Sequence, residues 1–299
     1  MSPDTPFQIK VAVASHSQIG EGAIWDERDN RLWWVDITAG LIHVYDPARD
    51  TNTTYEFGEM VGSISLREAG GLVVAARSGF WFFDPETGAR QHIHDPEPDR
   101  PDNRFNDGAT DYQGRFWAGT MRHDPPAAPT GRWYRLDPDL SVTPWLGDKF
   151  TPNGMVFSAD GKTMFHSDSN PAVRSIWTSD YDTQTGTPGA PKLLFDTNAV
   201  AGRPDGATID SEGCYWFAGV SGWQIYRLTP QGAVDRVIDM PVERPSKPMF
   251  GGPNLDILYV TSIGIGLTPG TEGQQPGAGH LFALHGLGVT GIKQPRFAG

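Results

Sequence analysis

A short phrase recurs along this chain and limits its fold more than any other feature. The phrase is a polar residue, a glycine, a few mostly apolar residues, a turn rich in Asp and Ser, and then an aromatic strand. Four clear copies and two weaker ones begin at Glu21, Asn106, Pro152, Pro204, Gly62 and Lys247. Equivalent points in successive copies lie 41 to 52 residues apart. That period is typical of a four-stranded propeller blade.

A third strand follows most copies, as in LIHVYDPARD from Leu41 and GFWFFDPETG from Gly79, and it ends in another turn, often containing Asp-Pro or Gly. Short alternating runs rich in aromatic and β-branched residues predict antiparallel strands. The 36 glycines and 25 prolines are unfavourable to long helices. We therefore predict an all-β, six-bladed β-propeller with four antiparallel strands per blade.

The repeat covers nearly the whole chain, and no linker or change in composition divides it, so we expect one domain over residues 1–299. The last copy lacks an obvious outermost strand. The apolar stretch Phe7–Ala14 is predicted to supply that strand and so to close the ring without an exposed edge.

The net charge of −12 excludes nucleic acid and anionic membranes as expected partners. One cysteine, Cys214, cannot form an internal disulfide, and its apolar strand predicts a buried side chain. The first residues lack a basic start and a long apolar run, which favours a soluble cytoplasmic protein. A monomer is favoured.

Common nucleophile and cofactor motifs are missing: there is no GxSxG, HExxH, P-loop or GxGxxG. Oxygen ligands or isolated acids remain as candidates. Innermost strands begin near the channel mouth, so residues that precede the repeat glycine should converge on the axis. These residues are Glu21, Asp107, Asn153 and Asp205.

Carboxylate and amide oxygens form a hard site that suits Ca²⁺, Mg²⁺ or Mn²⁺, with Zn²⁺ or Fe²⁺ as alternatives. The competing interpretation is that Asn-Gly and Asp-Gly are ordinary turn dipeptides. Against it, Glu21-Gly22 is a poor turn pair, and the expected turns already occur later in the copies, for example at Ala159–Gly161 and Ser211–Gly213.

Several long motifs, in order along the chain, resemble the SMP-30/gluconolactonase family, which includes regucalcin and bacterial sugar lactonases. They are GEGAIWD at Gly20, RFNDGATDYQGRFWAGTM at Arg104, TPNGMVFSADGKTMFHSDS at Thr151, RPDGATIDSEGCYW at Arg203 and KPMFGGPNLDILYVTS at Lys247. The resemblance implies a six-bladed propeller that holds one divalent metal in its channel.

Residue by residue, the resemblance implies that Glu21, Asn153 and Asp205 hold the metal and that Asp205 is also the general base. It implies that Arg104 and Asn106 contact the substrate. Asn106 thus takes the place in the channel that the repeat had given to its neighbour Asp107. Adjacent residues of a strand point to opposite faces, so Asp107 is then expected to be a structural residue that accepts backbone hydrogen bonds. From the residues alone, a solvated surface arginine is the favoured interpretation of Arg104, and only its place inside RFNDG indicates a role in the site.

The implied activity is hydrolysis of a sugar lactone to its aldonic acid, with a carbonyl polarised by the metal and a water activated by Asp205. Two alternatives stay open: an organophosphate or aryl-ester hydrolase, and a non-enzymatic propeller that binds Ca²⁺ or serves as an interaction scaffold. Unlike many relatives, the loop at 121–132 carries only one acid, Asp124, while Arg122 or His123 could reach the substrate. Asp168 is either a channel residue or a structural acid at a strand end.

Overall fold

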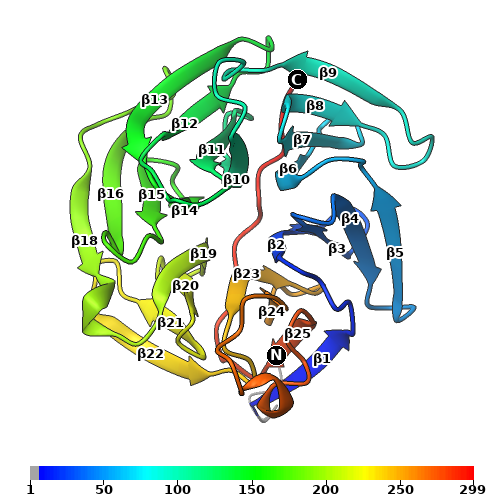
Figure 1. The fold of residues 1–299 in the computed structure, drawn as a ribbon, viewed down its shortest axis with the longest axis vertical. Helices are drawn as coiled ribbons and strands as arrows, with labels where there is room; N and C mark the ends of the chain where they lie inside the picture. The colour runs from blue at the N-terminus through cyan, green and yellow to red at the C-terminus, as the bar shows by residue number, and fades with distance from the viewer. Residues whose placement is uncertain (1–6) are drawn as a thin grey trace.

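The recurring phrase forms the two inner strands of each blade in the computed structural model, which describes residues 7–299. Six antiparallel sheets surround a central axis (Figure 1). This arrangement confirms the predicted all-β, six-bladed propeller. The predicted domain begins at residue 1, and residues 1–6 lie outside the described part.

The four strands of a blade lie in chain order from the axis outward in five of the six sheets. The innermost strands are β2 (Gly20–Asp26), β6 (Val61–Leu66), β10 (Asn103–Thr110), β14 (Pro152–Phe157), β19 (Arg203–Ile209) and β23 (Pro245–Gly251). The second strands are β3 (Arg31–Asp36), β7 (Leu72–Ala76), β11 (Phe116–Arg122), β15 (Thr163–Asp168), β20 (Tyr215–Val220) and β24 (Ile257–Ser262).

The outer half of each blade is more exposed. The third strands are β4 (Leu41–Asp46), β8 (Gly79–Phe83), β12 (Gly131–Leu136), β16 (Ser175–Asp182), β21 (Gln224–Leu228) and β25 (Leu281–His285). The outermost strands are β5 (Thr51–Glu56), β9 (Arg90–His94), β13 (Val142–Lys149), β18 (Lys192–Asp196), β22 (Val234–Asp239) and β1 (Gln8–Val13). A two-residue strand, β17 (Thr187–Pro188), also pairs with β16. Short 3₁₀ turns lie at Thr197–Ala199 and Glu272–Gln274.

Both ends of the described chain contribute to the last blade. Strand β1 pairs antiparallel with β25, so the sheet order is β1-β25-β24-β23. The strand lies within the predicted stretch Phe7–Ala14. It covers an edge of β25 that would otherwise present unpaired backbone groups.

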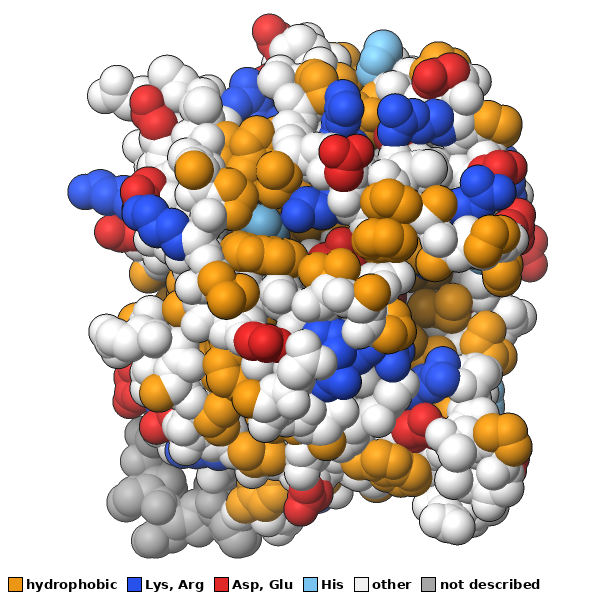
Figure 2. Space-filling view, turned by 60° about the vertical axis from the view of Figure 1, so that its left-hand side comes forward, with side chains coloured by type: hydrophobic (Ala, Val, Ile, Leu, Met, Phe, Trp, Pro, Cys, Tyr) orange, Lys and Arg blue, Asp and Glu red, His pale blue; other side chains and the backbone are white. Residues whose placement is uncertain are grey.

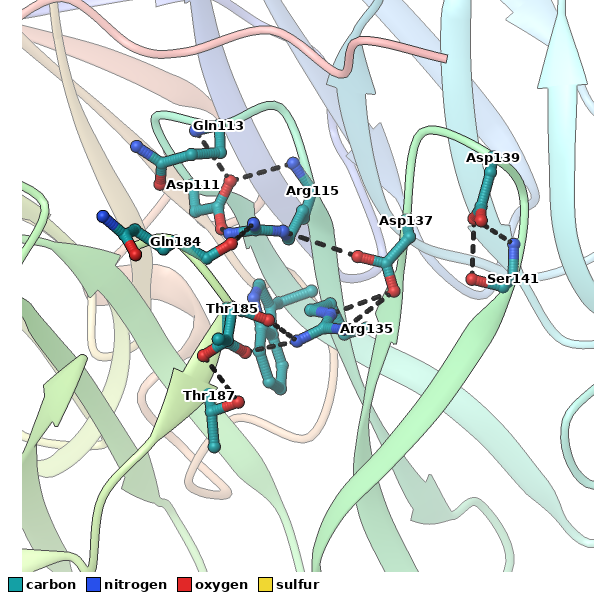
Figure 3. A network of polar contacts seen from close by, with 12 residues as sticks. Asp111, Gln113, Arg115, Arg135, Asp137, Asp139, Ser141, Gln184, Thr185 and Thr187 are labelled. Carbon is teal, nitrogen blue, oxygen red and sulfur yellow. Dashed lines mark hydrogen bonds and ion pairs between the residues drawn. The ribbon is translucent and has the colours of Figure 1, made fainter. Parts of the chain in front are cut away.

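The hydrophobic core lies between neighbouring blades. Between the β10–β13 blade and the next, Trp117 and Trp133 pack with Met155, Met164 and Tyr181. Figure 3 shows a polar clamp between the same two blades: Arg115 donates to the carbonyls of Thr183 at 3.1 Å and Gln184 at 2.8 Å. In the same clamp Arg135 donates to the carbonyl of Thr185 at 3.0 Å.

The C-terminal segment (residues 286–299), red in Figure 1, crosses the centre of the ring on the face of the inner-strand turns. Its backbone forms hydrogen bonds with four different blades. In each blade the partner lies at the end of the innermost strand or in the turn that follows it. The pairs are Ser211 N to Thr290 O, Gly291 N to Leu255 O, Phe297 N to Leu66 O and Ala298 N to Gly114 O, at 2.7 to 3.0 Å. The segment therefore ties blades together, a role that the repeat pattern did not predict.

Replacing Phe297 in this segment with Ala is expected to lower the free energy of unfolding by about 3–5 kcal/mol. The ring is fully buried and packs in one core cluster with Phe80, Phe105 and Phe116. Urea unfolding measures the change, and Val237→Ala, at a half-exposed valine, is the matched control. An equal, small loss in both variants would contradict this account of the segment.

His166 is expected to make the protein less stable in acid. The ring is fully buried beside Trp145 and Trp177, and neither ring nitrogen has a hydrogen-bond partner within residues 7–299. Burial, with a smaller effect of Lys149, lowers the pKa of His166 from 6.5 to about 3. The unfolded chain binds a proton below pH 6.5 that the folded chain does not, so stability is lost as the pH falls.

The loss should be about 1.4 kcal/mol per pH unit between pH 6.5 and 3. Urea unfolding of His166→Phe and of the wild type, from about pH 7 to pH 4, isolates this contribution because the carboxylates are common to both. The variant should show the flatter profile. His94→Gln, at an exposed histidine, should show the same dependence of unfolding free energy on pH as the wild type. If the pH profile of His166→Phe runs parallel to that of the wild type, His166 is not the cause of the acid sensitivity.

On the face shown in Figure 2, acidic and basic side chains are interspersed and hydrophobic side chains occur in small groups. Such a mixture is typical of a solvated protein surface. Within residues 7–299 no helix has the length and apolar character needed to cross a bilayer.

Candidate active site

Every innermost strand has a shift in register near its start, where it pairs with the second strand. The shifts lie at 21–24, 61–63, 105–108, 153–156, 204–207 and 245–248. A β-bulge adds one residue on one strand and re-aims the side chains beside it. Gly22 and Gly154 occupy the left-handed region with φ of 61°, a conformation that glycine adopts without strain. Gly22, Gly62, Gly154 and Gly206 thus lie within these bulges, and Gly108 is the first paired residue after one. Asn106 and Asp205 lie within the bulges, and Glu21 and Asn153 lie directly before them.

The pairing between the first and second strands of each blade also explains why Asn106, and not Asp107, corresponds to Asp205. On β10 the bulge falls between the paired residues Phe105 and Gly108, and on β19 between Pro204 and Ala207. Asn106 and Asp205 are therefore each the first residue after the last regular pair. Aligning the copies of the repeat on their glycines alone therefore placed the copy on β10 one residue out of register, so that Asp107 instead of Asn106 matched Asp205.

Glu21 and Asp205 are both almost completely buried at the centre of the ring. Burial, followed by the charge of Asp107, raises the pKa of Asp205 to about 7, while Arg203 and Lys247 act in the opposite direction. Burial and the charges of Asp205 and Asp107 raise the pKa of Glu21 well above its usual range. The Oε2 atom of Glu21 accepts a hydrogen bond of 3.0 Å from the Gly22 amide. The two carboxyl groups thus repel each other and lack full compensation by positive charge.

A chain of hydrogen bonds links three blades through the other candidates. Arg104 Nη1 donates to Asn106 Oδ1 at 2.8 Å, and Asn106 Nδ2 donates to Asn153 Oδ1 at 3.2 Å. Asn153 Nδ2 donates to Ser169 Oγ at 2.6 Å, and Ser169 Oγ donates to the Pro204 carbonyl. These bonds orient the Asn153 amide so that its nitrogen faces Ser169 and its oxygen faces Asn106. Sequence reasoning missed Ser169, because a serine at a strand end carries no distinguishing signal.

Arg104 is buried and is not a solvated surface arginine. Burial lowers its pKa to about 10, and the charges of Glu21 and Asp205 oppose that shift. Its Nε also donates to His123 Nδ1 at 3.3 Å. His123 is therefore the residue of the 121–132 loop that contacts a candidate side chain. Arg122 instead pairs with Asp102 at 3.1 Å.

Asp107 and Lys247 form a buried ion pair across the centre, with 2.8 Å between Lys247 Nζ and Asp107 Oδ1. The other oxygen of Asp107 accepts a backbone hydrogen bond from Met155 at 3.2 Å. Lys247 was not singled out from the sequence, because it comes from the most divergent copy of the repeat. Asp168 has a different environment: it accepts backbone hydrogen bonds from Phe150, Thr151 and Asn170 at 2.9 to 3.1 Å, which is typical of a structural acid at a strand end.

The donor set suits a divalent cation. Two buried carboxyl groups with raised pKa values and one oriented amide oxygen are all hard oxygen donors. Within residues 7–299 no cluster of three or more His, Cys, Asp or Glu residues is arranged to hold a metal. A cation held by Glu21 and Asp205 would therefore depend on the amide of Asn153 as its third protein ligand.

Known proteins are similar to this chain in sequence and fold over nearly their full lengths. The 6-deoxy-6-sulfogluconolactonase of Pseudomonas putida is 36% identical over 97% of this chain and 99% of its own. Regucalcin of Xenopus laevis is 33% identical over 98% of this chain and 99% of its own. The crystal structure of a calcium-binding regucalcin from Agrobacterium tumefaciens superimposes with a TM-score of 0.91, at 27% identity, over 98% of both chains.

The match to a defined protein family is equally broad. Residues 19–264 match the SMP-30/Gluconolactonase/LRE-like region. That span begins just before β2 and ends just after β24, so it takes in all six innermost strands. The chain belongs to the SMP-30/gluconolactonase/LRE-like family.

Proposed function

We propose that this chain is a metal-dependent sugar lactonase, a hydrolase that opens an aldonolactone to the aldonic acid. The observation that carries the proposal is the buried pair Glu21 and Asp205 beside the oriented amide of Asn153. The relative named 6-deoxy-6-sulfogluconolactonase supports lactone chemistry. The substrate is a small sugar lactone.

Glu21, Asn153 and Asp205 would hold one divalent cation. When bound, the cation would supply Lewis acidity toward the lactone carbonyl and positive charge that lowers the pKa of both carboxyl groups. The oxygen donors favour Ca²⁺, Mg²⁺ or Mn²⁺ over Zn²⁺ or Fe²⁺. The calcium-binding relative is consistent with this order.

Asp205 would act as the general base. Its carboxylate accepts a proton from the water that adds to the lactone carbonyl carbon, and it returns that proton to the ring oxygen as the carbon–oxygen bond breaks. One water is consumed, and a carboxyl and a hydroxyl group are formed. No covalent intermediate with the protein is required.

Arg104 and Asn106 would position the sugar. Arg104 Nη1 and Nε are engaged with Phe105, Asn106 and His123, which fixes the plane of the guanidinium group. A fixed guanidinium beside the carboxyl groups suits a hydroxyl or carbonyl oxygen of the lactone. The chain Asn106–Asn153–Ser169 then couples substrate position to the orientation of the Asn153 oxygen.

The deciding experiment is acid release from a panel of pentono- and hexonolactones by chelated protein that is resupplied with each of the five cations. Turnover above the spontaneous rate should disappear on chelation and return with one or a few cations. Aryl esters and phosphotriesters are assayed in parallel. Metal-dependent turnover of those substrates alone would assign the protein as an organophosphate or aryl-ester hydrolase instead of a lactonase. No turnover of any substrate would favour a non-catalytic metal-binding protein.

We also propose that the protein acts in the cytoplasm as a monomer. Cys214 is a buried free thiol, which suits a reducing compartment. Light scattering of the purified protein and fractionation of the source cells test both points.

A further inference from the structure

A buried ion pair crosses the central channel next to the three proposed cation ligands. Lys247 lies on β23, and its Nζ atom is 2.8 Å from Oδ1 of Asp107 on β10. Both side chains are almost completely buried. Removing two charges from water is costly, so a buried ion pair is weak evidence for a stabilising role. The position of this pair in the channel points to a functional role instead.

The lysine of the pair packs below the two proposed carboxylate ligands. Its stem lies so close to Gly206, the residue after Asp205, that no Cβ would fit there. Lys247 and Gly22, the residue after Glu21, also line the same small cavity. Both contacts fall one residue further along an innermost strand than a carboxylate ligand. The lysine therefore lies directly beneath the site, on the side of the channel interior.

The carboxylate of the pair lies below the proposed amide ligand. Oδ2 of Asp107 accepts a hydrogen bond of 3.2 Å from the backbone amide of Met155, two residues after Asn153. Asp107 also directly follows Asn106, whose side chain donates to Asn153 Oδ1 at 3.2 Å. A third carboxylate is thus present in the channel beside the two carboxylate ligands.

The two charges of the pair act on the ligands in opposite directions. Burial raises the pKa of Glu21 and of Asp205, and the charge of Asp107 raises both further, while the charge of Lys247 opposes the shift. An ammonium group that is bonded to Asp107 does what a second cation would do there. It binds the carboxylate and removes one negative charge from the surroundings of the site.

The number of free carboxylates decides how strongly such a site attracts a cation. Two carboxylates balance the charge of a divalent cation, whereas a third would bind any cation more tightly and would favour a higher charge. We propose that Lys247 is a positioning residue that neutralises Asp107 and thereby sets the charge of the cation site to suit a reversibly bound divalent cation. This inference rests on the cation site of the proposed function.

Calorimetric titration of chelated protein with Ca²⁺ tests the proposal. Asp107→Asn leaves the lysine uncompensated and should weaken Ca²⁺ binding by about tenfold or more, and Lys247→Met should strengthen it by a similar factor. The double variant lacks both charges and should bind Ca²⁺ within about threefold of the wild type. The matched control is Lys293→Met, at an exposed lysine, which should keep the wild-type affinity.

The trivalent cation Tb³⁺ separates an effect of charge from damage to the structure. Lys247→Met should increase the affinity for Tb³⁺ more than the affinity for Ca²⁺, because the added attraction grows with the charge of the cation. A merely structural role would instead weaken the binding of both cations in both single variants. If Lys247→Met does not fold, Asp107→Asn and the double variant decide, since adding Lys247→Met must then restore the affinity that Asp107→Asn has lost.

Lactone turnover, measured separately, distinguishes this inference from the lactonase assignment. If the affinities change as expected but no lactone is hydrolysed, the role of Lys247 stands and the lactonase fails. If the wild type hydrolyses a lactone but Asp107→Asn binds Ca²⁺ as the wild type does, the lactonase stands and the role of Lys247 is wrong. A double variant that binds Ca²⁺ as weakly as Asp107→Asn would also overturn that role.

Discussion

Asp205→Asn is expected to lower kcat/KM for the preferred lactone by about a thousandfold or more. A general base contributes about 10²–10⁴ to the rate, and the substitution also removes one negative charge from the proposed cation site. The amide has nearly the same shape as the carboxyl group, and removing one of the mutually repelling buried carboxyl groups should not destabilise the metal-free fold. Steady-state kinetics at saturating cation, with circular dichroism as a folding check, measures the effect.

Two companion variants make the Asp205 result specific. Glu21→Gln removes a charge of the same site without removing the base, so raising the cation concentration should restore much of its activity. Asp139→Asn, at an exposed turn carboxylate that accepts hydrogen bonds from Ser141, should behave as the wild type. Retention of a tenth or more of the activity by Asp205→Asn would remove that residue from the role of base.

Lys247→Met is expected to lower the free energy of unfolding by about 3–5 kcal/mol, because it leaves Asp107 charged and buried without its partner. The two side chains of this pair are only 4% and 1% exposed. Urea unfolding near neutral pH measures the loss. The matched control is Lys293→Met, since Lys293 pairs with Glu27 at 3.3 Å but is 83% exposed. That substitution should cost less than about 1 kcal/mol.

A double-mutant cycle shows whether the buried pair itself is responsible. Asp107→Asn combined with Lys247→Met removes both charges, so the double variant should be more stable than Lys247→Met alone. If the two losses simply add, the destabilisation comes from packing of the lysine stem and not from the orphaned carboxylate.

The number of blades and the position of the candidate site near the start of the innermost strands could be predicted, because both are properties of the repeat. A glycine at a fixed place in each copy indicated where the innermost strands begin. The reason for some of these glycines could not be predicted, since it lies in other blades. A Cβ at Gly206 would approach the Lys247 side chain to 2.3 Å, and one at Gly154 would approach the Tyr215 hydroxyl to 2.2 Å.

Strand alternation was too simple a rule for Asn106 and Asp107. It assumes a regular ladder, but both residues lie on a bulge, where the alternation is interrupted. The partners Lys247 and Ser169 could not be found for a related reason. Lys247 meets Asp107 across the centre of the ring, and Ser169 joins Asn153 of its own blade to the Pro204 carbonyl of the next. No local pattern records contacts between blades. The C-terminal segment was missed because it is not part of the repeat.

The pairing of β1 with β25 has a consequence for biosynthesis. Strand β1 is made long before β25 and must wait for it, because nearly the whole of the described chain separates the two strands. While the ribosome is still translating, five blades can assemble, but the ring stays open and β1 remains unpaired. Contacts this distant in sequence slow folding. The exposed strands of the open ring are then the natural targets for a chaperone, or for the β1 strand of a second nascent chain.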